Sequence, residues 1–147
     1  MYIVQRFVLL SLLVLVAACS KGNTSVDQKP VTDGAVPSNF VGVYRGTLTA
    51  TAKAGPLNET TTDVITITVS ADNTIRFEGD DPDEVFVTKV GANGNFNGSL
   101  PIKTGDCEGN VDVSGSVDGT TASGDLGGSG KCKGVSVGVS GNFSATK

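Results

Sequence analysis

The chain has two regions that differ in their pattern of hydrophobic and polar positions. Near its start, residues 7–16 are apolar except for Ser11, with Arg6 before them and two alanines after them. A positive charge, an apolar run and small residues, in that order, are typical of a secretory signal peptide. The run is shorter than the roughly 20 apolar residues that a membrane-spanning helix needs. The pattern therefore predicts a signal peptide over residues 1–18.

From Phe40 onward the pattern changes to a period of two. Apolar or glycine positions alternate with polar ones, which is typical of antiparallel strands with one buried and one solvated face. Short Gly, Asn and Asp turns separate the alternating segments, and no segment carries a helical stripe. The pattern predicts about eight strands in residues 39–147, as a single antiparallel up-and-down β-barrel, with a β-sandwich as the alternative.

Two features of residues 39–147 favour the barrel. Glycine, then Asn or Asp, then an apolar residue recurs four times, with glycine and apolar residue on one face, and inward glycines permit the bends and bulges that closure requires. The strands near Phe40 and Phe143 also have matching inner faces, so their pairing would remove both exposed edges. The repeats are Gly94-Asn95-Phe96, Gly109-Asn110-Val111, Gly124-Asp125-Leu126 and Gly141-Asn142-Phe143.

The tetrapeptide Val16-Ala17-Ala18-Cys19 ends the signal segment and resembles the lipobox of bacterial lipoproteins. The resemblance implies cleavage before Cys19, a diacylglyceryl group on its sulfur, and a further acyl chain, such as palmitate, on the new amino group. Several acyl chains on one residue satisfy the requirement for two signals in stable membrane anchoring. Ser20 stands where an Asp often marks inner-membrane retention in this family. The resemblance thus favours an outer-membrane destination, with the membrane as a partner through the lipid on Cys19.

The segment between the cysteine and the strands is predicted to be a lipidated, disordered tether over residues 19–38. It is rich in Ser, Thr, Gly, Pro and Asp and has no apolar periodicity. Such a segment buries too little apolar surface to offset the entropy lost on ordering. The alternative is that a few of its residues, such as Val31 or Val36, pack on the domain.

The first predicted strand carries a second resemblance. The pattern Phe-x-Gly-x-Tyr-x-Gly-x-Leu from Phe40 to Leu48 is similar to the opening of small lipocalin-like and avidin-like barrels. The resemblance implies a meander barrel. Those families often carry a Trp near the start, and this chain has no Trp. No binding residue is therefore assigned from them.

Two cysteines remain once Cys19 carries lipid. An even pair in an exported domain predicts a disulfide between Cys107 and Cys132. Because Cys132 is out of phase with the inward Val135, we expect a bulge at Gly134 to bring both onto one face. A metal or redox pair is the alternative, which the absence of His and of a third thiol disfavours.

The densest group of charges offers one candidate for a Ca²⁺ site, formed by Asp80, Asp81 and Asp83. Such a site needs about six to eight oxygens held in a defined loop. The stretch Asp81-Pro82-Asp83 supplies two carboxylates. A solvated hairpin loop explains these charges better, so no metal and no cofactor is predicted.

Charge and composition limit the functions that the chain can have. The net charge of −4 becomes −5 when Arg6 is removed with the signal peptide. Binding to phosphate backbones needs clustered Lys and Arg, so we expect no nucleic-acid partner. The chain has no His, the commonest general acid–base group, and its domain thiols are predicted to be oxidised. We therefore expect a protein that is not an enzyme.

The sequence thus predicts a lipid-anchored lipoprotein of the cell envelope whose barrel binds a small apolar ligand or a protein partner. Its predicted interior of Val, Gly, Ala and a few Phe suits an apolar ligand. The alternative is a structural or interaction module with a packed core, by analogy with inhibitors of cell-wall hydrolases. A hydrolase that uses Asp or Glu residues in one cleft is a third and less favoured hypothesis.

Overall fold

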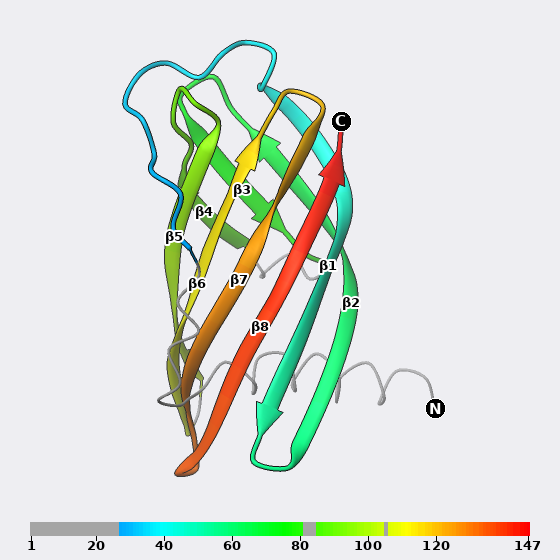
Figure 1. Ribbon diagram of the computed structural model, residues 1–147, viewed down its shortest axis with the longest axis vertical. Coiled ribbons are helices and arrows are strands. Elements are labelled where there is room, and N and C mark those ends of the chain that lie inside the picture. The colour runs from blue at the N-terminus through cyan, green and yellow to red at the C-terminus, as the bar shows by residue number, and fades with distance from the viewer. Residues whose placement is uncertain (1–26, 81–84, 105) are drawn as a thin grey trace.

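The computed structural model describes residues 27–80, 85–104 and 106–147. This part of the chain is all-β, with eight antiparallel strands in an up-and-down, nearly closed barrel and no helix (Figure 1). The predicted barrel is confirmed, and the alternative of a sandwich is wrong. The strands are β1 (Gly42–Ala54), β2 (Leu57–Val69), β3 (Thr74–Glu78), β4 (Val85–Lys89), β5 (Asn95–Thr104), β6 (Cys107–Val117), β7 (Thr121–Cys132) and β8 (Val135–Thr146).

Pairing of the first strand with the last closes most of the barrel. The strand order is β4-β3-β2-β1-β8-β7-β6-β5, and β1 pairs antiparallel with β8, as the matching inner faces predict. The two remaining edges are β4 and β5, which follow each other along the chain. An isolated bridge joins Val90 to Phe96, and the Thr88 hydroxyl donates to the Asn97 carbonyl at 2.7 Å. These contacts hold the two edges together at one end of the barrel.

The two ends of the barrel differ in their turns. We call the end with the β1–β2 and β7–β8 turns the lower end, and the end with the C-terminus the upper end (Figure 1). The β7–β8 turn is Lys133-Gly134, with φ angles of 49° and 80°, so Cys132 pairs directly with Val135. A two-residue turn of this kind joins adjacent strands without a bulge. The bulge predicted at Gly134 is therefore wrong, because residues that flank such a turn already share a face.

The upper half is filled by a layer of phenylalanine rings over glycines. In one row across four strands, Phe96 pairs with Gly115, Gly115 with Gly124, and Gly124 with Phe143. A Cβ built on Gly115 would lie 2.7 Å from the Phe96 ring, and one on Gly124 would lie 2.7 Å from the Phe143 ring. The rings thus lie where side chains at these glycines would be.

Phe77 of β3 connects this row to the opposite wall. Its ring centroid lies 5.5 Å from that of Phe96, 5.4 Å from that of Phe143 and 5.7 Å from that of Phe86. These spacings are typical of favourable aromatic pairs. The four rings, which we call the Phe layer, span the interior and leave the upper half packed.

Inward glycines also let neighbouring strands approach closely. A Cβ on Gly124 would collide with the backbone oxygen of Ser114, and one on Gly46 would collide with that of Ser144. Since only glycine lacks this atom, these positions permit the coiling of the sheet that closure needs. This agrees with the role predicted for the glycines of the repeat, although Gly94 lies in the β4–β5 turn, with φ of 79°, and not on a strand.

Residues 27–36, which we call the strap, run along the outside of β5 and β6 to the upper end (Figure 1). Val36 is 8% exposed and belongs to the core, whereas Val31 is 39% exposed. Residues 27–36 of the predicted tether thus lie along the barrel, with Val36 packed on the domain as the alternative expects, and residues 19–26 lie outside the described part. Side chains on the barrel hold the strap through its backbone oxygens: Ser114 donates to Asp27, Asn97 to Lys29, and Asn95 to Pro30, at 3.2, 3.2 and 3.0 Å.

Tyr44 fastens the segment after the strap to the first strand. Its side chain is fully buried, and its hydroxyl donates to the Phe40 carbonyl at 2.7 Å. Burial, and secondarily the charge of Asp118, raises the pKa of Tyr44 above its usual value. The phenol therefore stays protonated and keeps this hydrogen bond.

We expect Gly124→Ala to lower the free energy of unfolding by about 1–3 kcal/mol, the range for overpacking a filled interior. The added methyl group meets both the Ser114 backbone and the Phe143 ring. The matched control is Gly138→Ala on β8, where a Cβ meets no atom within 4 Å. That variant should be neutral or slightly more stable, because alanine restricts the unfolded chain. Urea denaturation followed by circular dichroism measures both, and equal stability of the two variants would contradict the role given to Gly124.

Candidate functional site

Below the Phe layer, the inner face of the barrel is lined by small side chains. Strand alternation and register place them opposite one another on β1, β6, β7 and β8. No aromatic residue occupies the inner positions of these strands below Phe143. We call this surface the small-residue wall: Ala50, Ala52, Val111, Gly128, Gly130 and Val139.

The lower half also has two unpaired backbone edges. Strands β3 and β4 have five residues each, whereas their neighbours β2 and β5 have 13 and 10. Strand β3 pairs with β2 only from Thr66 to Val69. Among the described residues, no strand pairs with the far side of β2 from Leu57 to Ile65, or of β5 from Gly98 to Thr104. In Figure 1, β3 and β4 accordingly cover only the upper half of the barrel.

Two polar side chains lie on the inner face of β2 at this level. Thr61 pairs with Ala50 and Asp63 with Leu48, and both share the face of the buried Ile65. The Thr61 hydroxyl oxygen is buried and is the only such side-chain atom of the described residues without a hydrogen-bond partner. A buried hydroxyl without a partner is unfavourable by about 1–3 kcal/mol. Thr61 therefore marks a position where a ligand atom would complete a hydrogen bond.

Sequence reasoning missed Thr61 and Asp63. The available signal is the phase of the strand: counting back in steps of two from Ile67 and Ile65 reaches Asp63 and then Thr61. Polar residues at inward positions of an otherwise apolar alternation are unusual and point to a site. The apolar alternation of this strand ends at Val64, so its polar part before Val64 carries no apolar signal of an inner wall.

The predicted disulfide is present at the lower end. Cys107 begins β6 and Cys132 ends β7, and they are paired residues bonded through their sulfur atoms, with 4.1 Å between their Cα atoms. This confirms the predicted pairing, and sulfur atoms bonded to each other do not hold a metal ion. The bond joins the strands that carry part of the small-residue wall.

The other predicted site residues lie mostly outside the described part. Cys19 and the signal peptide are outside it, so the lipid attachment stays a prediction. Asp80 is exposed, while Asp81 and Asp83 are outside it, so the structure does not test the disfavoured Ca²⁺ candidate. Within residues 27–80, 85–104 and 106–147, no three acidic, His or Cys side chains group closely enough to hold a metal ion. The same residues contain no helix that could cross a membrane.

The upper end carries a carboxylate with several hydrogen bonds. Asp118, in the β6–β7 turn, accepts bonds from the backbone N–H groups of Thr121 and Thr120 at 2.8 and 3.1 Å, and from both hydroxyls. These bonds, the backbone one from Thr121 first, lower the pKa of Asp118 to about 2. Asp118 thus stabilises a turn and leaves no free oxygen that would indicate a ligand site.

Comparison with known proteins adds no family to this description. No family model matches the chain. No curated protein is significantly similar to it in sequence. The geometry of the lower half and the lipobox resemblance are therefore the features that bear on function.

Replacement of both Cys107 and Cys132 by Ala is expected to lower the free energy of unfolding by about 3.5 kcal/mol, the chain-entropy value for a loop of this length. Urea denaturation with and without a reducing agent measures the effect. The oxidised protein should lose stability on reduction, and the double variant should not respond. A protein whose unfolding is unaffected by reduction would contradict the structural role of the bond.

A second prediction concerns how the stability of the protein changes at acid pH. The pKa of Asp118 is about 2 in the folded chain and near 3.8 without its bonds. Its contribution to stability is therefore complete above about pH 4 and is lost as the pH falls through 2. The melting temperature of Asp118→Ala should lie below that of the unmodified protein at pH 5, and the two should converge toward pH 2. A constant difference between pH 5 and pH 2 would assign the effect to something other than the carboxylate.

Proposed function

We propose that this chain is a lipid-anchored protein of the bacterial cell envelope that binds a small, mainly apolar ligand and is not an enzyme. The ligand lies against the small-residue wall, with the Phe layer above it. The observation that carries the proposal is the buried Thr61 hydroxyl without a hydrogen-bond partner, which lies beside Ala50 of the small-residue wall. Ligand sites commonly combine apolar walls with a few fixed polar groups.

The chemistry of the inner face limits the class of ligand. Ala, Gly and Val side chains offer apolar contact and no charge, so the body of the ligand is apolar. The Thr61 hydroxyl either donates or accepts one hydrogen bond. Asp63, two residues away on the same face, disfavours an anionic group beside Thr61 because like charges repel. The ligand that fits best is a neutral molecule with one hydroxyl, carbonyl or amide group.

The proposed lipid anchor and the disulfide support the cell envelope as the place where the ligand is bound. The lipobox Val16-Ala17-Ala18-Cys19 places acyl chains on Cys19, and Ser20 favours the outer membrane. The Cys107–Cys132 disulfide is consistent with export, since such bonds persist in oxidising compartments.

Substitution at Thr61 tests the proposal through two opposite effects. Thr61→Val removes the unpartnered oxygen while keeping the shape, so it should raise the stability of the empty protein by about 1 kcal/mol. The same variant should weaken ligand binding about three- to tenfold, the effect of one hydrogen bond between neutral groups. The control is Thr47→Val, an exposed outward position on β1.

Native mass spectrometry of protein purified from cells identifies the ligand for these measurements. The unmodified protein should retain an apolar molecule, and Ala52→Phe, which places a ring on the small-residue wall, should not. Intact mass of the same material reports acylation at Cys19. An acylated protein with no bound molecule, together with no stability gain in Thr61→Val, would exclude the ligand.

The unpaired edges of β2 and β5 favour a second candidate, an interaction module that binds a protein partner. A partner strand pairs with such edges through backbone hydrogen bonds. Pro101 and Lys103 lie on β5, however, and Pro and Lys are residues that protect edge strands from pairing. Crosslinking in whole cells would recover a specific envelope protein if this second function holds.

A further inference from the structure

We propose that the lower rim of the barrel docks on an anionic phospholipid surface and so fixes the orientation of the anchored protein. The lower rim comprises residues 53–59, 103, 104, 106–108 and 131–135, at the lower ends of β1, β2 and β5 to β8. The inference rests on the proposed lipid anchor at Cys19. It adds a second contact with the membrane, made by the folded domain itself.

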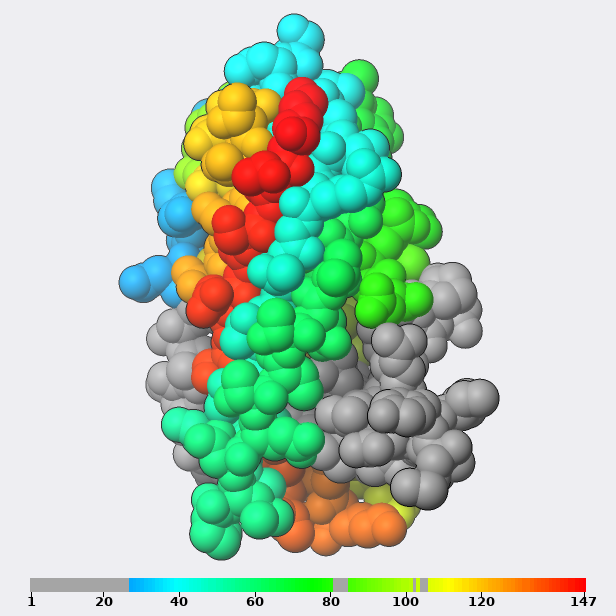
Figure 2. Space-filling view, turned by 90° about the vertical axis from the view of Figure 1, so that its right-hand side faces the viewer, coloured from blue at the N-terminus to red at the C-terminus, as the bar shows by residue number. Residues whose placement is uncertain are grey.

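Exposed apolar side chains lie at two tips of this rim. Leu57 is 72% exposed and Val135 is 54% exposed, the highest values among the large hydrophobic residues except for Val64 at 57%. Each lies beside a two-residue turn, Gly55-Pro56 and Lys133-Gly134. In Figure 2 the β1–β2 and β7–β8 hairpins form the lowest part of the molecule. A flat surface below the barrel would therefore meet these two side chains first.

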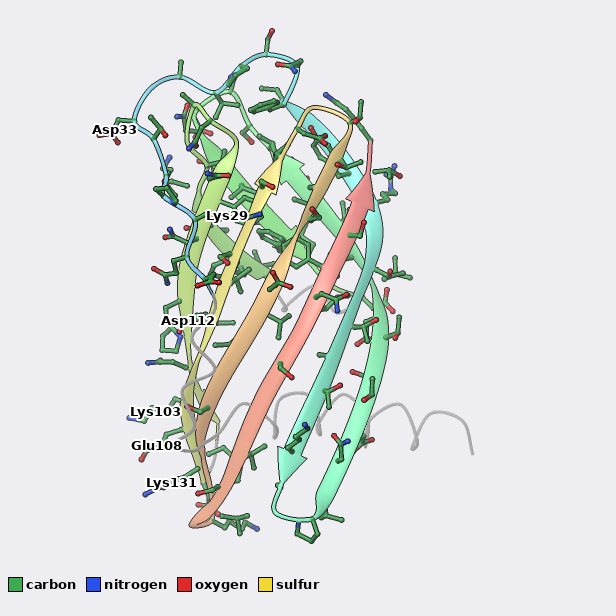
Figure 3. All side chains as sticks on the ribbon, in the orientation of Figure 1. Lys29, Asp33, Lys103, Glu108, Asp112 and Lys131 are labelled. Atoms are coloured by element: carbon green, nitrogen blue, oxygen red, sulfur yellow. A yellow bond between two sulfur atoms is a disulfide. The ribbon has the colours of Figure 1, made fainter. Side chains whose placement is uncertain are left out.

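The rim is also the positive part of an acidic protein. It carries four exposed lysines and three carboxylates, a net charge of +1, whereas the remainder of the processed chain has a net charge of −6. Glu108 lies between Lys103 and Lys131 in one cross-strand row, as Figure 3 shows. Lys133 lies in the β7–β8 turn itself, and Lys53 lies two residues before the β1–β2 turn. Lysines beside apolar side chains are the combination that anionic lipid surfaces attract.

The strap directs the anchor toward this rim. It descends from the upper end to Asp27, which receives a hydrogen bond from Ser114, about a third of the way down β6. From Ser114 to Cys107 the strand descends about 24 Å. Eight residue steps separate Cys19 from Asp27, and they span at most about 29 Å when extended. The chain is thus long enough to bring lipid on Cys19 level with the lower rim.

The upper end is more acidic than the lower rim. It carries Asp33, Asp72 and Asp118 beside Lys89 and Lys147, and hydrogen bonds lower the pKa of both Asp72 and Asp118, so their negative charge persists in mild acid. Contact of this end with an anionic surface would bring like charges together. The charge, the exposed apolar side chains and the course of the strap therefore all favour the lower end as the end that contacts the membrane.

Single tryptophans test the orientation, because the chain has none of its own. Leu57→Trp and Val135→Trp place a fluorophore on the rim, and Val43→Trp, an exposed position on the outer wall near the upper end, is the matched control. The acylated variants are incorporated into vesicles of phosphatidylcholine and phosphatidylglycerol that contain a spin-labelled quenching lipid. We expect quenching about twofold or more stronger at the two rim positions than at the control.

Charge reversal tests the class of lipid. Lys53→Glu combined with Lys133→Glu should remove the difference in fluorescence quenching between the rim tryptophans and the control tryptophan. Lys29→Glu combined with Arg45→Glu changes the net charge equally away from the rim and should preserve it. Equal quenching at all three tryptophan positions overturns the docking proposal. If the difference in quenching is the same in vesicles of phosphatidylcholine alone, the proposed requirement for an anionic lipid is overturned.

The intact mass of the protein distinguishes a failure of the docking proposal from a failure of the proposed lipid anchor. A protein without acyl chains at Cys19 overturns the proposed anchor, and the docking proposal with it. An acylated protein without preferential quenching overturns docking alone and leaves the anchor and the ligand site in place.

Discussion

The contact of phenylalanine rings with inward glycines is the interaction on which the rest of the barrel depends. At Gly115 and Gly124 the missing side chains leave space that the rings of Phe96 and Phe143 fill. The same absence at Gly124 lets β6 and β7 approach each other, so one residue serves both closure and packing. Phe77 then connects this row to the opposite wall at ring distances of 5.4 and 5.5 Å. Because buried aromatic rings dominate core energetics, the packing energy concentrates in the upper half.

This concentration divides the barrel into an upper part packed by aromatic rings and a lower part lined largely by small side chains. The short strands β3 and β4 supply Phe77 and Phe86 to the layer and end where the layer ends. Below it the small-residue wall on β1, β6, β7 and β8 consists of alanine, glycine and valine, and the lower edges of β2 and β5 lack partners among the described residues. The strap reinforces the same division, since Val36 packs into the upper core.

Alternation along the chain predicts the strands, their meander order and the pairing of the first with the last, because a period of two determines which face of each strand is buried. The cysteine pair predicts the disulfide for a similar reason, since only two thiols remain after lipidation. The strap could not be predicted this way. Its contacts are hydrogen bonds from Asn95, Asn97 and Ser114 to its backbone, and these leave no apolar pattern in the segment. Thr61 was missed because its significance depends on which inner positions lie below the Phe layer.

The position of the disulfide explains how the lower half remains ordered without large side chains. A wall of alanine and glycine buries little apolar area, so packing stabilises it weakly. The Cys107–Cys132 bond instead acts mainly on the unfolded chain, whose entropy it lowers, and therefore needs no volume inside the barrel. It joins β6 and β7 at the end that lacks the Phe layer. A covalent link thus stabilises the lower half and leaves its inner face lined by small side chains, as a site for a small apolar ligand requires.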